Sequence, residues 1–387
     1  MADVVASAMV GVPAGLGQPA AELALNGDGA VRRFPAIWLR DNCPCPQCKD
    51  PHSGQKLFGI TDLPENIAIG SVTDDGVTVS VHFEPDDHRG VFTRAWLMRH
   101  GSDGYGLDPR TEDAKVLWTA TDVDLGAMTG SWPDLIADPT HREYCLDALV
   151  RLGFVVLEKV PARAGAVLDV AGEFGFVRET NYGKLFDVRI TDAATNLAFT
   201  GLPITPHTDN PYRDPVPTVQ LLHCLVNQAD GGDSGLVDGF GAASFLRDTE
   251  PEAFAILART PVTFRYQDSS VDLSASTSLI VLDPRGRIRA VRYNNRCMQP
   301  LPLRSAEAVA FYAAYRLFSR ALLRPTAQLN LRLSAGDCLV FDNTRVLHAR
   351  TGFTAAGGRH LQGCYADIDA VESQLRVLRR GGGGDAQ

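Results

Sequence analysis

Three residues, His207-Thr208-Asp209, form an H-x-D triplet that follows a proline-containing bend and precedes an apolar, strand-like run. On an extended segment, residues two positions apart point to the same side, so the His207 imidazole and the Asp209 carboxylate can meet at one metal ion. A third ligand must come from elsewhere in the chain. The best candidate is His348, which lies shortly after the expected core strand Cys338–Phe341.

Two imidazoles and one carboxylate on one face of a metal leave open positions for other ligands. This set is typical of non-haem Fe(II) oxygenases, in which a cosubstrate and dioxygen both reach the iron. His223 and His360 compete with His348 as the distal ligand, although His223 lies inside an apolar run and is more simply explained as a core histidine. The spacing therefore favours iron ligands at His207, Asp209 and His348.

Arg359 begins a strand-like segment shortly after His348. The planar guanidinium matches a carboxylate in a bidentate way. A dicarboxylate such as 2-oxoglutarate can chelate iron through its keto-acid end, and Arg359 would then bind its far carboxylate. The alternative interpretation of Arg359 is a surface salt bridge of little energetic value.

A second cluster of possible metal ligands, Cys43-Pro-Cys45-Pro-Gln-Cys48, has the spacing C-x-C-x2-C. In an intracellular chain such spacing is typical of zinc rather than of a disulfide. From the residues alone, the fourth ligand is either His52 or His88. The other cysteines occur singly among apolar neighbours, so we expect a reducing, cytoplasmic environment.

The whole chain has 387 residues, 45% of them hydrophobic, which is long for one domain and suits two. We expect a small β-rich zinc-binding domain at 1–105, with half-buried strands such as Val77–Phe83, and a second domain at 115–380. The glycine- and proline-containing segment Gly101–Asp113 is the expected linker. With a net charge of -9 and no basic stripe, no nucleic-acid partner is expected. No run approaches the roughly 20 apolar residues of a membrane span.

The second domain mixes short strands with helices and lacks a βαβ rhythm, which favours a β-sandwich or jelly roll decorated by helices. Apolar spacing predicts helices at 141–152, ending at Gly153, at 162–174, at 250–260 and at 305–323, the last capped by Ser305. Strands are expected at 154–157 and 218–226, and a hairpin at 278–293. Residues 328–333 alternate between apolar and polar types, which predicts a strand. Residues 335–337 predict a turn, and 338–341 predict a second strand after it.

Several segments together resemble the gamma-butyrobetaine dioxygenase and trimethyllysine dioxygenase family, a branch of the taurine-dioxygenase-like, 2-oxoglutarate-dependent oxygenases. They are Thr205-Pro-His-Thr-Asp-Asn-Pro211, Val219-Gln-Leu-Leu-His-Cys224, Gly231-Gly-Asp-Ser234, Val237-Asp-Gly-Phe240, Phe341-Asp-Asn343 and Arg359-His-Leu-Gln-Gly-Cys-Tyr-Ala-Asp367. The similarity runs from about Trp38 to about Arg380. It implies a mainly β fold with helices, whose catalytic domain is a double-stranded β-helix (jelly roll).

The resemblance also implies roles for particular residues. His207, Asp209 and His348 would bind Fe(II), and Arg359 would anchor 2-oxoglutarate. Zinc would be held by the three cysteines and His88, because the family's zinc-binding histidine follows a Pro-Asp dipeptide and Pro85-Asp-Asp-His88 is the nearest match.

Family substrates carry a trimethylammonium group, which cannot donate hydrogen bonds and is usually held by aromatic faces. The resemblance implies such a cage from Tyr182, Phe186, Phe199 and Tyr365, and contacts to the substrate carboxylate from Asn196 and Asn294. Phe186 and Phe199 stand where the family commonly has Trp and Tyr. By position alone, Arg296 could add charge for a more anionic head group.

The activity that these features imply is hydroxylation of gamma-butyrobetaine to L-carnitine, with 2-oxoglutarate converted to succinate and carbon dioxide and ascorbate as reductant. A homodimer is typical of the family. The alternatives are hydroxylation of another quaternary-ammonium acid, such as trimethyllysine or a trimethylammonium phosphonate or sulfonate, and a catalytically silent zinc- and iron-binding interaction protein.

Overall fold

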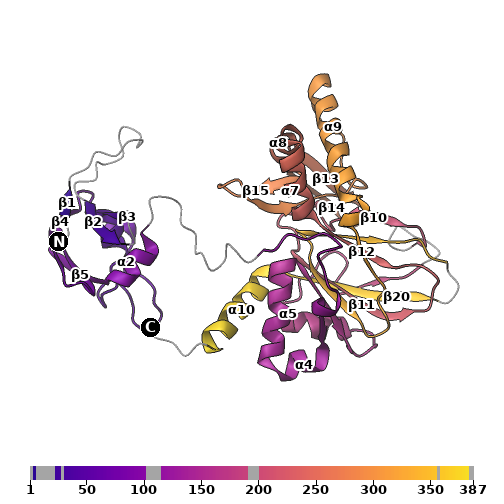
Figure 1. Ribbon diagram of the computed structural model, residues 1–387, viewed down its shortest axis with the longest axis horizontal. Coiled ribbons are helices and arrows are strands. Elements are labelled where there is room, and N and C mark those ends of the chain that lie inside the picture. The colour runs from indigo at the N-terminus through magenta and orange to yellow at the C-terminus, as the bar shows by residue number, and fades with distance from the viewer. Residues whose placement is uncertain are drawn as a thin grey trace. The chain divides into compact units, whose positions relative to one another are not determined.

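The computed structural model describes residues 3–5, 22–27, 30–101, 115–190, 200–354 and 358–382. The chain divides into two compact units, Met1–Asp113 and Ala114–Gln387 (Figure 1). The expected linker lies almost entirely outside the described residues. Within those residues, no helix is long and apolar enough to cross a membrane.

The first unit contains two three-stranded antiparallel sheets. One is β1 (Asp3–Val5), β2 (Glu22–Gly27) and β3 (Ala30–Pro35), and the other is β4 (Ala68–Asp74), β5 (Thr78–Glu84) and β6 (His88–Thr93). Among its described residues, the helices are α1 (Ala36–Asp41), η1 (Ile60–Asp62) and α2 (Arg94–His100). Alternate residues of β5 are buried, which confirms the half-buried strand expected there.

The second unit is built on two sheets that face each other across a buried core. The six-stranded sheet has the order β7-β8-β18-β11-β20-β9, and the four-stranded sheet has the order β10-β19-β12-β17. Their strands are β7 (Thr129–Ser131), β8 (Phe154–Glu158), β9 (Phe186–Val188), β10 (Ile204–His207), β11 (Val219–Asn227), β12 (Ser234–Asp238), β17 (Leu329–Leu331), β18 (Cys338–Asp342), β19 (Val346–Arg350) and β20 (Arg359–Ala366).

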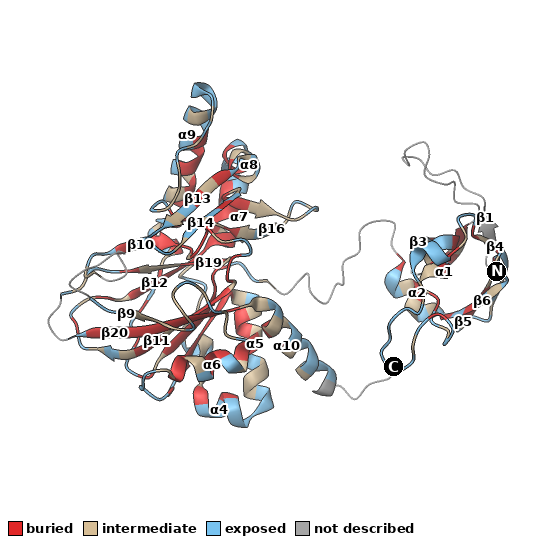
Figure 2. Ribbon diagram, turned by 180° about the vertical axis from the view of Figure 1, so that it is seen from behind, coloured by how far each residue is buried: buried red, intermediate tan, exposed pale blue. Residues whose placement is uncertain are grey.

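Apolar side chains from both sheets, among them Leu236, Phe341 and Leu361, form one buried cluster between them. Figure 2 shows these strands as largely buried. The mainly β, jelly-roll architecture with helices is therefore confirmed.

Two groups of helices lie on opposite sides of the sheets (Figure 1). The first group packs on the outer face of the six-stranded sheet: η2 (Gly126–Met128), α4 (Trp132–Ala137), α5 (Pro139–Leu152), α6 (Ala166–Phe174) and α10 (Ile368–Gly382). The second group belongs to an insert between β12 and β17: α7 (Gly239–Thr249), α8 (Pro251–Arg259), α9 (Ser305–Leu322) and η4 (Pro325–Ala327). The insert also holds the hairpins β13 (Val262–Gln267) with β14 (Asp272–Thr277) and β15 (Ile280–Leu282) with β16 (Ile288–Val291).

The predicted helix at 141–152 is confirmed as α5, and Gly153 ends it with a left-handed φ of 87°. The helix expected from residue 162 begins only at Ala166, because Gly165 immediately before it adopts a φ of 84°. The expected cap at Ser305 is wrong. Arg304 is the N-cap of α9, and its backbone N–H donates to the Glu307 carboxylate.

The predicted hairpin at 278–293 is confirmed as β15 and β16. The strands expected at 328–333 and 338–341 form, but not as a pair. β17 pairs with β12 in the four-stranded sheet, whereas β18 lies between β8 and β11 in the six-stranded sheet. The turn at 335–337 therefore crosses from one sheet to the other, because Leu331 and Leu339 bury their side chains in the core between the sheets.

Candidate active site and metal centres

The H-x-D triplet and His348 meet where two strands of the four-stranded sheet pair. β10 runs antiparallel to β19, with His207 and His348 as direct partners, and their ring centroids are 4.1 Å apart. His207 Nε2 lies 3.4 Å from Asp209 Oδ1, and His348 Nε2 lies 3.9 Å from Asp209 Oδ2. One ligand atom from each residue falls within 4.8 Å of the others. Metal bonds of about 2 Å require ligand atoms roughly 3 Å apart, so these three side chains would need to move only slightly closer together to bind a metal ion.

The protonation of this cluster suits a metal. His207 Nδ1 lies 3.0 Å from the Thr205 carbonyl and donates to it, which leaves Nε2 free as a ligand atom. Burial lowers the pKa of His348 to about 3, so its imidazole is neutral. Burial opposes ionisation of Asp209, but the adjacent His207 and His348 and the positive charge of Arg296 hold the pKa of that carboxyl below its usual range. Neutral imidazoles and an ionised carboxylate are the forms that bind metal.

The two competing histidines lie outside this cluster. His223 is buried in β11, as expected of a core histidine. His360 Nε2 lies 2.6 Å from the Asp187 carboxylate.

Arg359 lies at the start of β20 and lines the same cavity of about 510 Å³ as His207, Asp209 and His348. It is only 7% exposed, and its Nε donates to the Gly232 carbonyl at 3.1 Å. A Cβ on Gly232 would come within 2.9 Å of the Arg359 side chain, so the close approach requires glycine. In the described part of the chain no carboxylate forms an ion pair with Arg359, so it is not the surface salt bridge of the alternative interpretation. A buried cation in this position suits an anionic ligand.

Four of the expected substrate contacts line this cavity: Tyr182, Phe186, Asn294 and Tyr365. The ring centroid of Phe186 lies 6.1 Å from that of Tyr182 and 5.2 Å from that of Tyr365, so the three aromatic side chains form one continuous wall. The other two expected contacts, Asn196 and Phe199, lie outside the described residues.

The Asn294 side chain also forms hydrogen bonds within the protein. Its Nδ2 donates to the Thr208 carbonyl at 3.1 Å, and its Oδ1 accepts from the backbone N–H and the Nε of Arg296. The side chain therefore braces the H-x-D triplet and holds Arg296, which also lines the cavity.

Two tyrosines of the cavity were missed by sequence reasoning. The Tyr212 hydroxyl lies 2.9 Å from that of Tyr182, and the Tyr212 ring stacks on Tyr266 with centroids 5.3 Å apart. Tyr212 closely follows Asp209 in the chain, which was a usable signal. Tyr266 comes from β13 in the insert, and nothing local in the sequence indicated it.

Two amide side chains that contact Asp209 were missed as well. Asn343, 1% exposed, accepts from the Asp209 backbone N–H at 2.7 Å and donates to the carbonyls of Asp209 and Pro217. Gln220 donates from Nε2 to Asp209 Oδ2 at 2.9 Å. A glutamine inside the apolar strand β11 was the available signal for the second of these.

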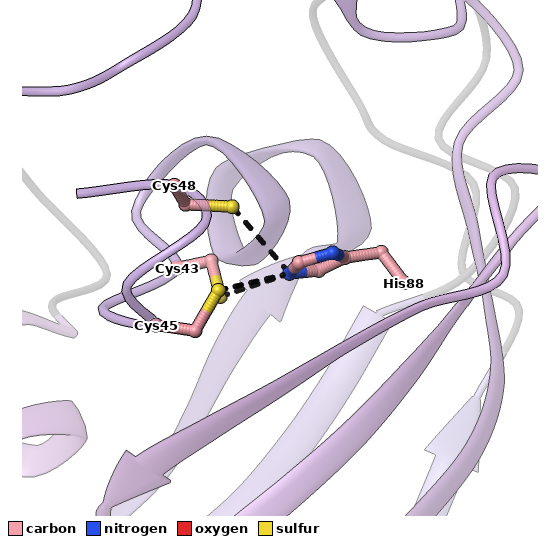
Figure 3. Close-up of side chains that lie close together, drawn as sticks. All are labelled: Cys43, Cys45, Cys48 and His88. Carbon is pink, nitrogen blue, oxygen red and sulfur yellow. Dashed lines mark hydrogen bonds between the residues drawn. The ribbon is translucent and has the colours of Figure 1, made fainter.

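The cysteine cluster gathers around His88 (Figure 3). His88 Nε2 lies 3.2 Å from the Cys43 sulfur, 3.6 Å from Cys45 and 3.5 Å from Cys48. For metal–sulfur bonds near 2.3 Å and a metal–nitrogen bond near 2.0 Å, a tetrahedral site places these atoms roughly 3.5 Å apart. His52 is exposed and is not part of the cluster.

The surroundings of the cluster also suit a cation. No disulfide joins the three cysteines. Burial raises the pKa of Cys43 to about 12, so a thiolate there needs a positive partner such as a metal ion. Arg40 supports the cluster by donating to the Cys48 sulfur at 3.2 Å while Asp86 holds its guanidinium at 2.7 Å.

Comparisons with known proteins agree with this geometry. Residues 118–365 match the family described as taurine catabolism dioxygenase TauD, TfdA family, and residues 22–98 match the gamma-butyrobetaine hydroxylase-like N-terminal family. The gamma-butyrobetaine dioxygenase of Pseudomonas sp. (strain AK-1) is 38% identical over 91% of this chain and 92% of its own length. The human gamma-butyrobetaine dioxygenase is 33% identical over 90% and 91%. The trimethyllysine dioxygenase of Meyerozyma guilliermondii is 28% identical over 91% and 92%.

The jelly roll, the His-Asp-His cluster and these matches define a dioxygenase that uses Fe(II) and 2-oxoglutarate to act on a small molecule. The chain belongs to the taurine catabolism dioxygenase TauD, TfdA family. An enzymatic role thereby replaces the alternative of a catalytically silent interaction protein.

Proposed function

We propose that this enzyme hydroxylates gamma-butyrobetaine to L-carnitine and releases succinate and carbon dioxide from 2-oxoglutarate. The observation that carries the proposal is the 38% identity, over nearly the whole length of both chains, to a gamma-butyrobetaine dioxygenase. An aromatic-walled cavity beside the His-Asp-His cluster supports it, because a trimethylammonium group is held by aromatic faces.

His207, Asp209 and His348 are the proposed iron ligands, and Arg359 is the proposed anchor of 2-oxoglutarate. Bound iron and 2-oxoglutarate supply the oxidising chemistry. The residues of the chain position the reactants. Asn343 fixes the backbone of Asp209, and Gly232 orients the Arg359 guanidinium toward the cavity. The buried setting of Arg359 strengthens its attraction for a carboxylate relative to the same pair in water.

The substrate cation is proposed to rest against Tyr182, Phe186 and Tyr365, where each favourable cation–π contact contributes roughly 0.5–2 kcal/mol. Asn294 and Arg296, which line the same cavity, are the proposed contacts of the substrate carboxylate. The resemblance adds Asn196 and Phe199 to this set.

Trimethyllysine is the second candidate substrate. The 28% identity to a trimethyllysine dioxygenase over 91% of this chain favours it, and so does Phe186, which departs from the family's usual tryptophan. Phenylalanine has a weaker quadrupole than tryptophan, so a cage that contains it discriminates less between related cations.

A substrate panel tests the proposal. The purified protein is incubated with Fe(II), ascorbate and 2-oxoglutarate, and succinate and hydroxylated product are followed by mass spectrometry. We expect gamma-butyrobetaine to be converted with about one succinate per product and with a kcat/KM at least about 10-fold above that of trimethyllysine. Incubation without an amine measures uncoupled succinate release. Turnover of trimethyllysine, or of a phosphonate or sulfonate analogue, without turnover of gamma-butyrobetaine would replace the proposal.

Cys43, Cys45, Cys48 and His88 are proposed to hold a structural Zn(II), since four protein ligands close the site. Replacing Cys45 with serine is expected to remove about one zinc per chain and to lower the melting temperature of the first unit, because structural zinc provides folding free energy directly. Zinc is measured by elemental analysis and folding by circular dichroism. The control is Cys145→Ser, at a buried cysteine of the second unit, and it is expected to leave the zinc content unchanged. Wild-type protein purified without chelator and free of zinc would refute the assignment.

Further proposals concern the whole enzyme. We propose a cytoplasmic homodimer with ascorbate as reductant and no nucleic-acid or membrane partner, organised as a zinc-binding domain at 1–105 and a catalytic domain at 115–380. The family resemblance supports the dimer, and the single, unpaired cysteines support a reducing compartment.

A further inference from the structure

The Asp209 carboxylate accepts hydrogen bonds from two side chains of the six-stranded sheet. Its Oδ2 accepts one hydrogen bond from Gln220 Nε2 at 2.9 Å and another from the Tyr365 hydroxyl at 3.2 Å. Both donors are buried, with 1% and 3% exposure. Because a carboxylate can only accept, the amide nitrogen of Gln220 must be the atom that faces it.

The two donors stand side by side because of strand register. β11 and β20 are neighbours in the six-stranded sheet, and Gln220 and Tyr365 are direct partners in their pairing. Residues opposite each other on adjacent strands project from the same face. His207 and His348, by contrast, lie in the four-stranded sheet. The six-stranded sheet therefore supplies two donors to a ligand positioned by the opposite sheet.

The pattern of donors separates the two oxygens of Asp209. Each carboxylate oxygen offers about two lone-pair sites. Gln220 and Tyr365 donate to Oδ2, which also lies 3.9 Å from His348 Nε2, whereas Oδ1 accepts from neither and faces His207 Nε2 at 3.4 Å. Oδ1 is thus the oxygen to which the six-stranded sheet donates neither of these hydrogen bonds.

We propose that Gln220 and Tyr365 are positioning residues that fix the orientation of the Asp209 carboxylate, so that Oδ1 rather than Oδ2 is the oxygen offered to a metal ion. A carboxylate held in this orientation would leave other positions on the metal open to further ligands. The inference rests on the proposed assignment of His207, Asp209 and His348 as iron ligands, but not on the identity of the substrate.

Tyr365 has a second contact, which makes its two roles separable. Its ring packs on Phe186 with centroids 5.2 Å apart and forms part of the aromatic wall. A Tyr365→Phe variant keeps this ring and loses only the hydroxyl that reaches Asp209. If Tyr365 served only as part of the wall, the variant would bind metal normally.

The experiment measures the affinity of the full-length, zinc-loaded protein for Fe(II) by anaerobic calorimetry, and for Co(II) by visible absorption, which reports the coordination number. Loss of outer hydrogen bonds to a metal ligand typically weakens metal binding 10–100-fold. We expect Gln220→Leu and Tyr365→Phe each to weaken binding by about this factor and to alter the Co(II) spectrum.

Two matched controls remove similar groups elsewhere in the second unit. Tyr315→Phe deletes a buried hydroxyl that donates to Asn295, and Gln362→Leu removes a buried amide of β20 that donates to Asp187. Both should bind metal within about 2-fold of wild type. Wild-type affinity in Gln220→Leu and Tyr365→Phe would overturn the inference alone. Absence of Fe(II) binding by the wild-type protein would instead overturn the proposed iron site.

Discussion

Replacing His207 with alanine is expected to abolish turnover with every substrate and to reduce Fe(II) affinity by more than about 100-fold. Loss of a hydrogen bond to a metal ligand by itself weakens metal binding 10–100-fold, and this change removes one of the three ligands themselves. Asp209 and His348 would remain, but two protein ligands hold iron poorly against water. The loss is expected without unfolding, because His207 lies at the end of β10 and its ring contributes to the cavity rather than to an apolar cluster.

The measurement is succinate and product formation at saturating 2-oxoglutarate, together with Fe(II) binding under anaerobic conditions. His360→Ala is the matched control, because this neighbour of Arg359 was a competing ligand candidate and pairs with Asp187 outside the cluster. It should retain Fe(II) affinity and turnover within about 3-fold, as expected of a site with no shared partner. Retained turnover by His207→Ala would mean that the iron site lies elsewhere.

Replacing Arg345 with methionine is expected to destabilise the second unit by about 3–5 kcal/mol, because it leaves a buried carboxylate unpaired. Arg345 and Asp238 are both fully buried and form a two-pronged ion pair at 2.9 and 3.1 Å. The guanidinium also donates to the carbonyls of Arg151 and Val116. Asp238 in turn caps α7.

Urea unfolding followed by circular dichroism measures this effect as a lower midpoint with an unchanged slope. The control is Arg163→Met, which removes an ion pair to Asp169 that is 2.6 Å long but lies in solvent, with side chains 63% and 56% exposed. Exposed pairs contribute at most about 1 kcal/mol, so this variant should unfold almost like the wild type. A loss below about 1 kcal/mol in Arg345→Met would show that water or rearrangement compensates the buried charge.

The metal ligands could be predicted from the sequence where they lie close together in the chain. His207 and Asp209 share a side because an extended backbone alternates, and Cys43, Cys45 and Cys48 converge because the short loop between them leaves little choice. The lining of the cavity and the assignment of strands to sheets could not be predicted in this way. Tyr266 reaches it from the insert, and the strands on either side of residues 335–337 entered different sheets. Neither outcome has a local cause, because both depend on which apolar faces pack together.

The sequence by itself determined the ligand types, the H-x-D and cysteine spacings and several of the strands and helices, since each depends on residues near one another in the chain. The residues alone left His52 and His88 open and the family resemblance favoured His88, which the tertiary structure places at the three sulfurs. Only the tertiary structure decided that His348 pairs with His207 across two strands and that Gln220 and Tyr365 hold Asp209. The physical reason is strand register. A shift of one residue between β11 and β20 would move these donors to the opposite face of the sheet, and no short-range pattern specifies that pairing.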